Sequence, residues 1–402
     1  MAIDNKDKKI LNVPHLRFPE FSGEWEMVSL QDIATINPKS DPLQNTFIYI
    51  DLEAVEKGEL RKIQEIMREE APSRAQRVID NNDILFQCVR PYQKNNYIHR
   101  ILNTSNQQWV ASTGYAQIRT TELPNYIYHL LNTDEFNRKV MVRCTGSSYP
   151  AINSEDLATI HLYYTPDKKE QLKISRLLDL LDKRIATQNK IIDKLKSLIK
   201  GLPHKMAEIG LQKGCWEKVL LSTVLVERKE LNSELYTVHS VSVSEGVINQ
   251  IEYLGRSFAA KDTSNYHVAR YGDIIYTKSP TGDFPYGIVK QSYIEQPVAI
   301  SPLYGVYSPT SFETGVYLHY YFMSSVLAKN YLYPLIQKGA KNTINISNQR
   351  FLENRIALPL KQTDRHNIAR ALITIQKKLD IEKCAMDSLT KQRSYLLQQL
   401  FI

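Results

Sequence analysis

Residues 167–200 read DKKEQLKISRLLDLLDKRIATQNKIIDKLKSLIK, and the spacing of apolar side chains in this stretch decides the fold. The spacing alternates between three and four residues, and one polar residue belongs to the series. Its members are Ile174, Leu178, Leu181, Ile185, Gln188, Ile192, Leu195, Ile199 and Leu202. Such a heptad seam is typical of a helix that packs along its length on a second helix. We therefore expect a long helix here and a partner helix elsewhere in the chain.

The partner is found near the C-terminus, where residues 364–400 repeat this spacing. When the sequence is shifted by 194 positions, a second series aligns with the first. Its members are Ile368, Leu372, Ile375, Leu379, Glu382, Met386, Leu389, Arg393 and Leu396. A second match pairs GEWEMVSL at 23–30 with GCWEKVLL at 214–221, at a shift of 191. Two matches at nearly equal shift predict a tandem duplication in which each half ends in a long helix.

The order of these segments restricts how the two helices can pair. The first helix leads the chain away from the first half and the second follows the second half, so pairing along both seams requires antiparallel packing. About 34 residues at 1.5 Å each form a rod of roughly 50 Å, with the two similar domains in a pseudo-twofold arrangement. Gln188 and Glu382 occupy equivalent seam positions, where polar residues fix the register. The alternative is that each helix packs on its own domain.

The predicted fold class is α+β, with two mixed domains separated by the antiparallel coiled-coil helices. Both halves begin with strand-rich sequence and continue into apolar residues at helical spacing, at 122–144 and 314–336. We expect Pro203 to end the first helix. The predicted boundaries are a flexible tail at 1–13, domain 1 at 14–166, a long helix at 167–202, a linker at 203–213, domain 2 at 214–361 and a second long helix at 362–402.

Composition narrows the class of protein. The chain of 402 residues, with 43% hydrophobic residues, can form two ordinary cores. A net charge of +8 is compatible with a polyanionic partner such as DNA. The four cysteines are isolated in the sequence, which favours reduced thiols. The N-terminal segment has no apolar core of a signal peptide, and no window suits a membrane span, so we expect a cytoplasmic protein without a membrane partner.

The sequence contains no recognisable catalytic constellation. It lacks a G-x-x-x-x-G-K-[ST] phosphate loop, a G-x-G-x-x-G turn and an H-E-x-x-H pair. The nine histidines are scattered, and neither clustered acids nor Cys/His groups provide a metal site. We therefore expect a protein that is not an enzyme and that has no catalytic residue, metal or cofactor.

Polar loops at matching positions in the two halves are suited to contacting DNA. Arg, Lys, Asn and Gln side chains can pair with base edges, and Ser, Thr and Tyr commonly hold phosphates. The candidates in the first half are Gln87, Arg90, Tyr92, Lys94, Arg143, Thr145, Ser147, Ser148 and Tyr149. Those in the second half are Lys278, Ser279, Thr281, Lys338, Lys341, Asn342 and Thr343. Each residue could equally be a polar turn residue in solvent, and the repeated position favours a shared function.

These features together resemble the specificity subunit of type I restriction and modification enzymes over essentially the whole chain. The resemblance rests on PHLRFPEFSGEWEMVSLQDIA at 14–34, on the strands NNDIL and YGDII in the two halves, and on the loops that run into Ile152 and Ile346. It also rests on KEQLKISRLLDLLDKRI at 169–185, at the start of the first long helix.

The resemblance implies two target recognition domains that each read one half of a bipartite sequence in double-stranded DNA. It also implies that the helix pair docks two modification subunits, which carry S-adenosylmethionine and methylate adenine, and that a restriction (translocase) subunit completes the nuclease. The second half departs from the family pattern, because only Lys169, Glu170 and Gln171 in the first half keep the residues that precede the helix. A coiled-coil scaffold that bridges two proteins without binding DNA is the alternative.

Overall fold

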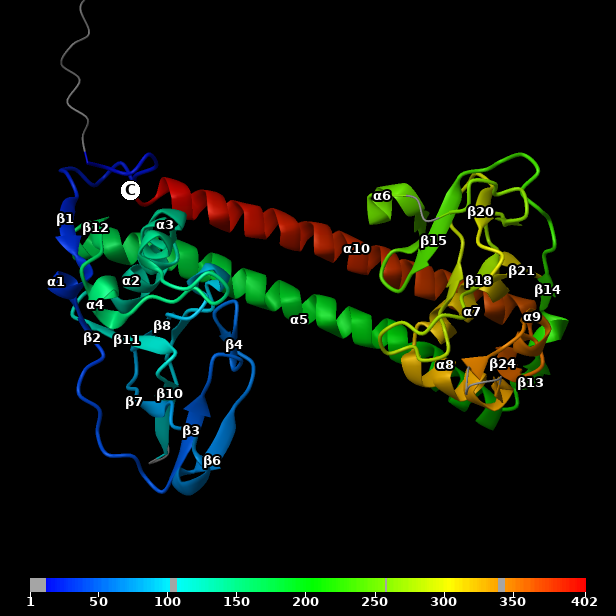
Figure 1. Cartoon of the computed structure of the whole chain (residues 1–402), viewed down its shortest axis with the longest axis horizontal. Coiled ribbons are helices and arrows are strands. Elements are labelled where there is room, and N and C mark those ends of the chain that lie inside the picture. The colour runs from blue at the N-terminus through cyan, green and yellow to red at the C-terminus, as the bar shows by residue number, and fades with distance from the viewer. Residues whose placement is uncertain (1–11, 102–106, 257–258, 339–343) are drawn as a thin grey trace, which may run out of the picture. The chain divides into compact units, whose positions relative to one another are not determined.

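The computed structural model describes residues 12–101, 107–256, 259–338 and 344–402 (Figure 1). The chain divides into two compact units. Unit 1 contains residues 1–187 and 386–402, and unit 2 contains residues 188–385. Each long helix therefore contributes one part to each unit. The two units are described separately below.

Unit 1 contains two four-stranded sheets and two two-stranded ones among the described residues. The first sheet has the order β6(Gln64–Met67)-β3(Thr46–Ile50)-β10(Gln108–Ser112)-β7(Ala75–Val78). The second has the order β2(Ala34–Ile36)-β11(Tyr115–Thr120)-β8(Ile84–Gln87)-β9(Tyr97–Ile98). β1(Glu26–Ser29) pairs with β12(His161–Tyr164), and β4(Val55–Glu56) with β5(Glu59–Leu60). All pairs are antiparallel except β10 with β3.

The helices of unit 1 cover the second sheet and form the main core with it. They are α1(Leu30–Ile33), α2(Pro124–Leu131), α3(Asp134–Arg143) and α4(Ser154–Ala158), with 3₁₀ turns η1(Arg68–Glu70) and η2(Pro91–Gln93). Trp25 and Tyr126 pack in this core with Phe401, at ring-centroid distances of 6.1 Å for Trp25–Phe401 and 5.4 Å for Tyr126–Phe401. The last residues of the chain thus complete the core of unit 1.

Unit 2 repeats the strand order of the two four-stranded sheets and of the β1–β12 pair. Its sheets have the orders β16(Gly246–Asn249)-β15(Val238–Ser242)-β20(Val298–Ile300)-β17(His267–Ala269) and β14(Leu225–Glu227)-β21(Gly305–Pro309)-β18(Ile274–Tyr276)-β19(Val289–Gln291). β13(Trp216–Leu220) pairs with β24(Arg355–Pro359), and β22(Gln337–Lys338) with β23(Ile344–Asn345). The helices and 3₁₀ turns are η3(Leu221–Thr223), α6(Gln250–Leu254), α7(Phe312–Phe322), α8(Ser325–Leu332), η4(Tyr333–Leu335) and α9(Asn348–Phe351). The expected pair of similar mixed α/β domains is confirmed.

The first long helix, α5(Lys168–Gln212), is longer than expected. The prediction that Pro203 ends it is wrong, and the residues predicted as a linker at 203–213 are helical up to Gln212. A proline inside a helix removes a backbone hydrogen bond and costs roughly 3 kcal/mol. Packing offsets this cost, since Ala207 is buried and Gly210 lies so close to Trp216 that a Cβ atom would be 2.0 Å from Cδ1 of the ring.

The second long helix, α10(Gln362–Gln399), contacts α5 within each unit. In unit 1, Ile174 and Leu178 share a core with Leu397 and Leu400, and the Arg393 guanidinium binds the Asp182 carboxylate one turn further along. This order of contacts makes the two helices antiparallel in unit 1. In unit 2, the Gln188 amide donates to the Glu382 backbone carbonyl at 3.0 Å and also contacts the Glu382 carboxylate. None of the fifteen seam residues from Ile174 to Ile199 and from Ile368 to Leu389 is exposed.

Candidate nucleic-acid interface and helix start

The loop that follows β8 in unit 1 is held by one buried amide. Gln87 is 2% exposed, and its side chain donates to the carbonyl of Val89 at 2.8 Å and to Oε1 of Gln93 at 2.9 Å. Its own Oε1 accepts from the backbone of Asn95 at 3.1 Å. The side chain of Gln87 therefore shapes the loop from the inside.

The same loop places two cations at unusual backbone positions. Arg90 and Lys94 flank the turn η2 with φ angles of 54° and 52°, a left-handed conformation that is uncommon outside glycine. Such residues are found at functional sites more often than elsewhere, because the surrounding structure must hold them there. Lys94 forms an ion pair with Asp134 at 2.6 Å, whereas Tyr92 between them is 51% exposed.

The second candidate loop of unit 1 joins the first. The backbone N–H of Arg90 donates to the carbonyl of Pro150 at 2.7 Å, and its guanidinium lies over the ring of Tyr149 at 4.3 Å. Tyr149 is 63% exposed, and Ser147, Ser148 and Thr145 are also exposed. Arg143 instead donates to the carbonyl of Asp156 at 2.7 Å and to the Thr159 hydroxyl at 2.8 Å. The two loops thus form one polar surface with an arginine–tyrosine stack within it.

In unit 2, the loop that follows β18 has a different construction. Thr281 and Phe284 exchange backbone hydrogen bonds of 3.1 and 2.9 Å, and Ser279 and Thr281 are exposed. At Gly287, with φ of 95°, a Cβ atom would lie 1.8 Å from the carbonyl oxygen of Thr277, so the turn requires glycine. Lys278 at the start of this loop is partly buried, and burial lowers its pKa, although the Glu227 carboxylate opposes that shift.

The remaining candidates of unit 2 fall at the edge of the described structure. The backbone of Lys338 in β22 pairs with that of Ile344 in β23. Lys341, Asn342 and Thr343 lie outside the described residues.

Both candidate loops follow a strand that begins directly after a buried aspartate. Asp83 is 1% exposed and receives two hydrogen bonds from the Arg119 guanidinium, at 2.7 and 2.8 Å. Asp273 is 2% exposed and receives two from Arg228, at 2.7 and 3.0 Å. A buried carboxylate requires such pairing, so these ion pairs fix the strands that carry the loops. Sequence reasoning noted the repeated aspartate and missed its two arginine partners.

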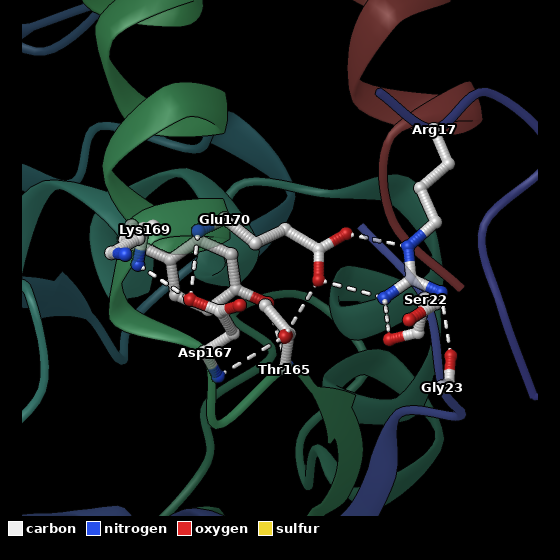
Figure 2. Close-up of polar contacts among 8 residues, drawn as sticks. Arg17, Ser22, Gly23, Thr165, Asp167, Lys169 and Glu170 are labelled. Carbon is white, nitrogen blue, oxygen red and sulfur yellow. Dashed lines mark hydrogen bonds and ion pairs between the residues drawn. The ribbon is translucent and has the colours of Figure 1, made fainter. Parts of the chain in front are cut away.

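The start of α5 combines a capping aspartate with buried polar side chains (Figure 2). Asp167 caps the helix, because its Oδ1 accepts from the backbone of Lys169 at 2.7 Å and of Glu170 at 3.3 Å. The Glu170 carboxylate, with no exposed surface, binds Nε of Arg17 at 2.7 Å and Nη2 at 2.9 Å, and also accepts from the Thr165 hydroxyl at 2.8 Å. The N-terminal segment is thereby fastened to the helix.

Gln171 is also fully buried, so the Glu-Gln pair of the family pattern faces the interior of unit 1. Its amide donates to the carbonyl of Thr165 at 2.8 Å and to Glu122 at 2.6 Å. Residues that a partner could reach lie on the neighbouring face of α5, around a groove of about 420 Å³. The groove is lined by Glu20, Phe21, Lys169, Leu172, Lys173 and Arg176.

The charges around this groove are unbalanced. Lys173 pairs with Glu20 and lies over the ring of Phe18 at 4.6 Å. Within the described part of the chain, Lys169 and Arg176 form no ion pair, so two positive charges remain beside the partly exposed Leu172 and Phe21. This surface is complementary to an acidic segment that carries apolar side chains.

The described residues contain neither a metal-binding cluster nor a membrane-spanning helix. No group of three or more His, Cys, Asp or Glu side chains is placed to hold a metal ion there. Within the same residues, no helix has the length and apolar character needed to cross a membrane.

Comparison with known proteins gives a family match and several structural likenesses. The family model for the type I restriction modification DNA specificity domain matches residues 22–197. No curated protein matches the chain. The type I restriction-modification S subunit from M. genitalium gives a TM-score of 0.58 at 14% identity, over 97% of this chain and 99% of that one.

Two other solved chains are similar. One, from work on complex assembly and conformational transition of the type I R-M system, gives a TM-score of 0.55 at 19% identity, over 94% of this chain and 97% of that one. The HsdS subunit from Thermoanaerobacter tengcongensis gives 0.43 at 20% identity, over 94% and 96%. The likeness to the S subunit from M. genitalium confirms the expected fold, and the family match confirms the expected resemblance.

Proposed function

We propose, from the match of residues 22–197 to the family model of type I restriction modification DNA specificity domains, that the chain is the DNA-recognition subunit of a type I restriction-modification complex. Each unit reads one half of a bipartite target in double-stranded DNA. The observation that supports this most directly is the repeated topology, in which the same strand of each unit, β8 or β18, leads into a polar loop.

The candidate residues take different parts in this reading. The exposed Tyr92, Ser147, Ser148, Tyr149, Ser279 and Thr281 contact DNA, together with Arg90, whose position over Tyr149 directs its guanidinium. Gln87, Lys94 and Arg143 act as positioning residues, because their side chains are engaged within unit 1. Methylation and cleavage are carried out by partner subunits, and this chain is not an enzyme.

The groove beside the start of α5 docks a modification subunit. Lys169 and Arg176 attract an acidic segment of that subunit, and Leu172 and Phe21 pack against its apolar side chains. A restriction subunit joins the resulting complex. Copurification of the full chain with the modification subunit tests this docking. Sequence recognition is then tested by letting genomic target fragments and unrelated DNA compete for the complex.

The decisive variant combines Leu172→Asp with Arg176→Glu. We expect the double variant to lose copurification by at least tenfold, while Val142→Asp, at a side chain that is 78% exposed on α3, behaves as wild type. Retention of the partner by the double variant would overturn the docking site. If the wild-type complex binds all DNA equally, the chain is a scaffold without sequence recognition, and the proposed function is overturned.

A further inference from the structure

Each unit contains a basic side chain with a buried nitrogen atom that lacks a partner. Among several such atoms are Nε of Arg77, in strand β7 of unit 1, and Nδ1 of His267, in strand β17 of unit 2. Neither nitrogen has a hydrogen-bond partner in the described part of the chain. An unsatisfied buried donor or acceptor costs about 1–3 kcal/mol, so its presence at matching places calls for a reason.

The two residues occupy the same position in the two copies of the fold. Arg77 pairs with Ala111 of β10, and His267 pairs with Ile300 of β20, where β10 and β20 hold the same place in sheets of identical order. The shift between them is 190 positions, the same shift that relates Asp83 to Asp273. The unpartnered nitrogen is therefore a repeated feature of the fold.

Each side chain acts electrostatically on a residue just beyond the strand that follows the buried aspartate. In unit 1 that residue is Cys88, whose thiol pKa is raised to about 12 by burial, against the opposing effect of the Arg77 charge. In unit 2 it is Lys278, related to Cys88 by the same shift of 190 positions. Burial lowers the pKa of His267, and the charge of Lys278 lowers it further, while Glu227 opposes both effects. The two pairs thus lie under equivalent loops.

Each pair contains one cationic side chain. It belongs to the strand residue in unit 1 and to the loop residue in unit 2. Arg77 supplies it beside a neutral thiol in unit 1, and Lys278 supplies it beside an imidazole in unit 2. Among the described residues, neither cation forms an ion pair or a side-chain hydrogen bond, and Glu227, which acts on Lys278 from a distance, is itself bound by Asn348 at 2.7 Å. A cation that is partly removed from water without a counter-ion destabilises the free protein, and a bound anion would offset that cost.

We propose that Arg77 in unit 1 and Lys278 in unit 2 each bind a phosphate of the target DNA, and so anchor the recognition loops that follow β8 and β18. This inference rests on the proposed function. A phosphate suits these positions better than a base edge, because both side chains are half-buried. Phosphate contacts also fix the register of a protein on the duplex without carrying sequence information.

The test is the salt dependence of DNA binding by the assembled complex, with Arg77→Gln in the full chain. Loss of one phosphate contact should reduce the slope of log K against log salt concentration by about 0.9, with the same methylation motif as wild type. The matched control is Arg61→Gln, which removes the same charge from a guanidinium that already pairs with Glu59 at 2.8 Å, and its slope should be unchanged. Lys278→Gln should repeat the effect of Arg77→Gln.

Three results would overturn the assignment. An unchanged slope for Arg77→Gln would show that Arg77 does not bind a phosphate. A methylation motif that changes at one half-site would show that Arg77 contacts a base instead. A lower unfolding temperature for Arg77→Gln would show that the arginine is satisfied inside the protein, since removal of an unpaired buried cation should leave stability equal or higher. If the wild-type complex does not prefer its own target, the proposed function itself is contradicted. The wild-type measurement therefore separates this outcome from failure of the phosphate assignment.

Discussion

At the scale of single residues, the two units conserve the position of a charge while changing the residue that supplies it. Asp83 is paired by Arg119 from β11, but Asp273 is paired by Arg228, which follows β14. According to the strand registers, the position of Arg119 is occupied in unit 2 by Ser308, and the position of Arg228 is occupied in unit 1 by Asn37. Each buried carboxylate thus pairs with one guanidinium, but the arginine belongs to a different neighbouring strand in each unit.

The ion pair that fastens the N-terminal segment to α5 should contribute strongly to stability. Arg17→Ala leaves the Glu170 carboxylate buried with only the Thr165 hydroxyl as a side-chain partner, so we expect a loss of about 3 kcal/mol in the free energy of unfolding. Urea unfolding of the full chain measures this loss. Arg138→Ala, which breaks an exposed pair with Glu135, should cost at most about 1 kcal/mol, and equal effects of the two changes would contradict the account.

Lys290 should make the stability of unit 2 depend on pH. It is 6% exposed on β19, and burial lowers its pKa to about 8, whereas the buried His319 nearby has its pKa lowered to about 3 and stays neutral. Between about pH 8 and 10.5 the unfolded chain holds the Lys290 proton that the folded chain has released, so this residue makes stability rise with pH across that window.

The measurement compares wild type with Lys290→Met by urea unfolding at pH 7 and pH 10. At pH 7 the variant should be more stable by up to about 3 kcal/mol, and this advantage should shrink as the pH rises. Lys329→Met, at an exposed side chain of α8, serves as the control. A stability difference that is the same at both pH values would show that Lys290 is not desolvated.

Residue roles were only partly predictable from the sequence. Polar residues in loops at matching positions predict a DNA-binding surface, and the predicted start of the first long helix at Asp167 agrees with the cap geometry. Whether a given side chain is free or engaged depends on partners distant in sequence. Lys94 meets Asp134 and Arg143 meets Thr159 only after the fold has formed, so no local pattern separates them from Arg90.

At the scale of elements, α5 shows where periodicity is sufficient and where it fails. The heptad spacing predicted the helix and its seam, because burial of an apolar stripe depends on local sequence alone. Its end was predicted from Pro203, and that prediction failed because contacts of Ala207 and Gly210 outside the seam keep the following residues helical. Tertiary packing overrides a local helix-breaking residue when the cost is only a few kcal/mol.

Two glycines of α5 test the continuity of this helix. Gly201 is exposed, and a Cβ atom there meets nothing within 4 Å, so Gly201→Ala should stabilise unit 2 by about 0.5–1 kcal/mol. Gly210→Ala should destabilise it, because the new methyl group would collide with the Trp216 ring. Chemical denaturation of both variants gives the comparison. No gain at Gly201 would indicate that the helix frays near Pro203.

At the scale of the whole molecule, duplication accounts for the proposed recognition of two half-sites by one chain. The strand orders of the two units are identical, and repeats at shifts of 190 to 194 positions made this predictable from the sequence. The bases that each unit reads were not predictable, because they depend on loop geometry and on DNA shape as well as on side-chain type. The proposed division of labour between this chain and catalytic partner subunits rests on the family match of residues 22–197.

The most direct test of this division is to map methylated adenines across the host genome with and without the chain. With the chain present, we predict methylation at a bipartite motif whose two defined halves flank unspecified bases, and loss of that methylation when the chain is deleted. Replacement of residues 276–287 by the corresponding loop of a chain with another target should change one half of the motif and leave the other intact. A continuous motif, or methylation that persists without the chain, would contradict the account.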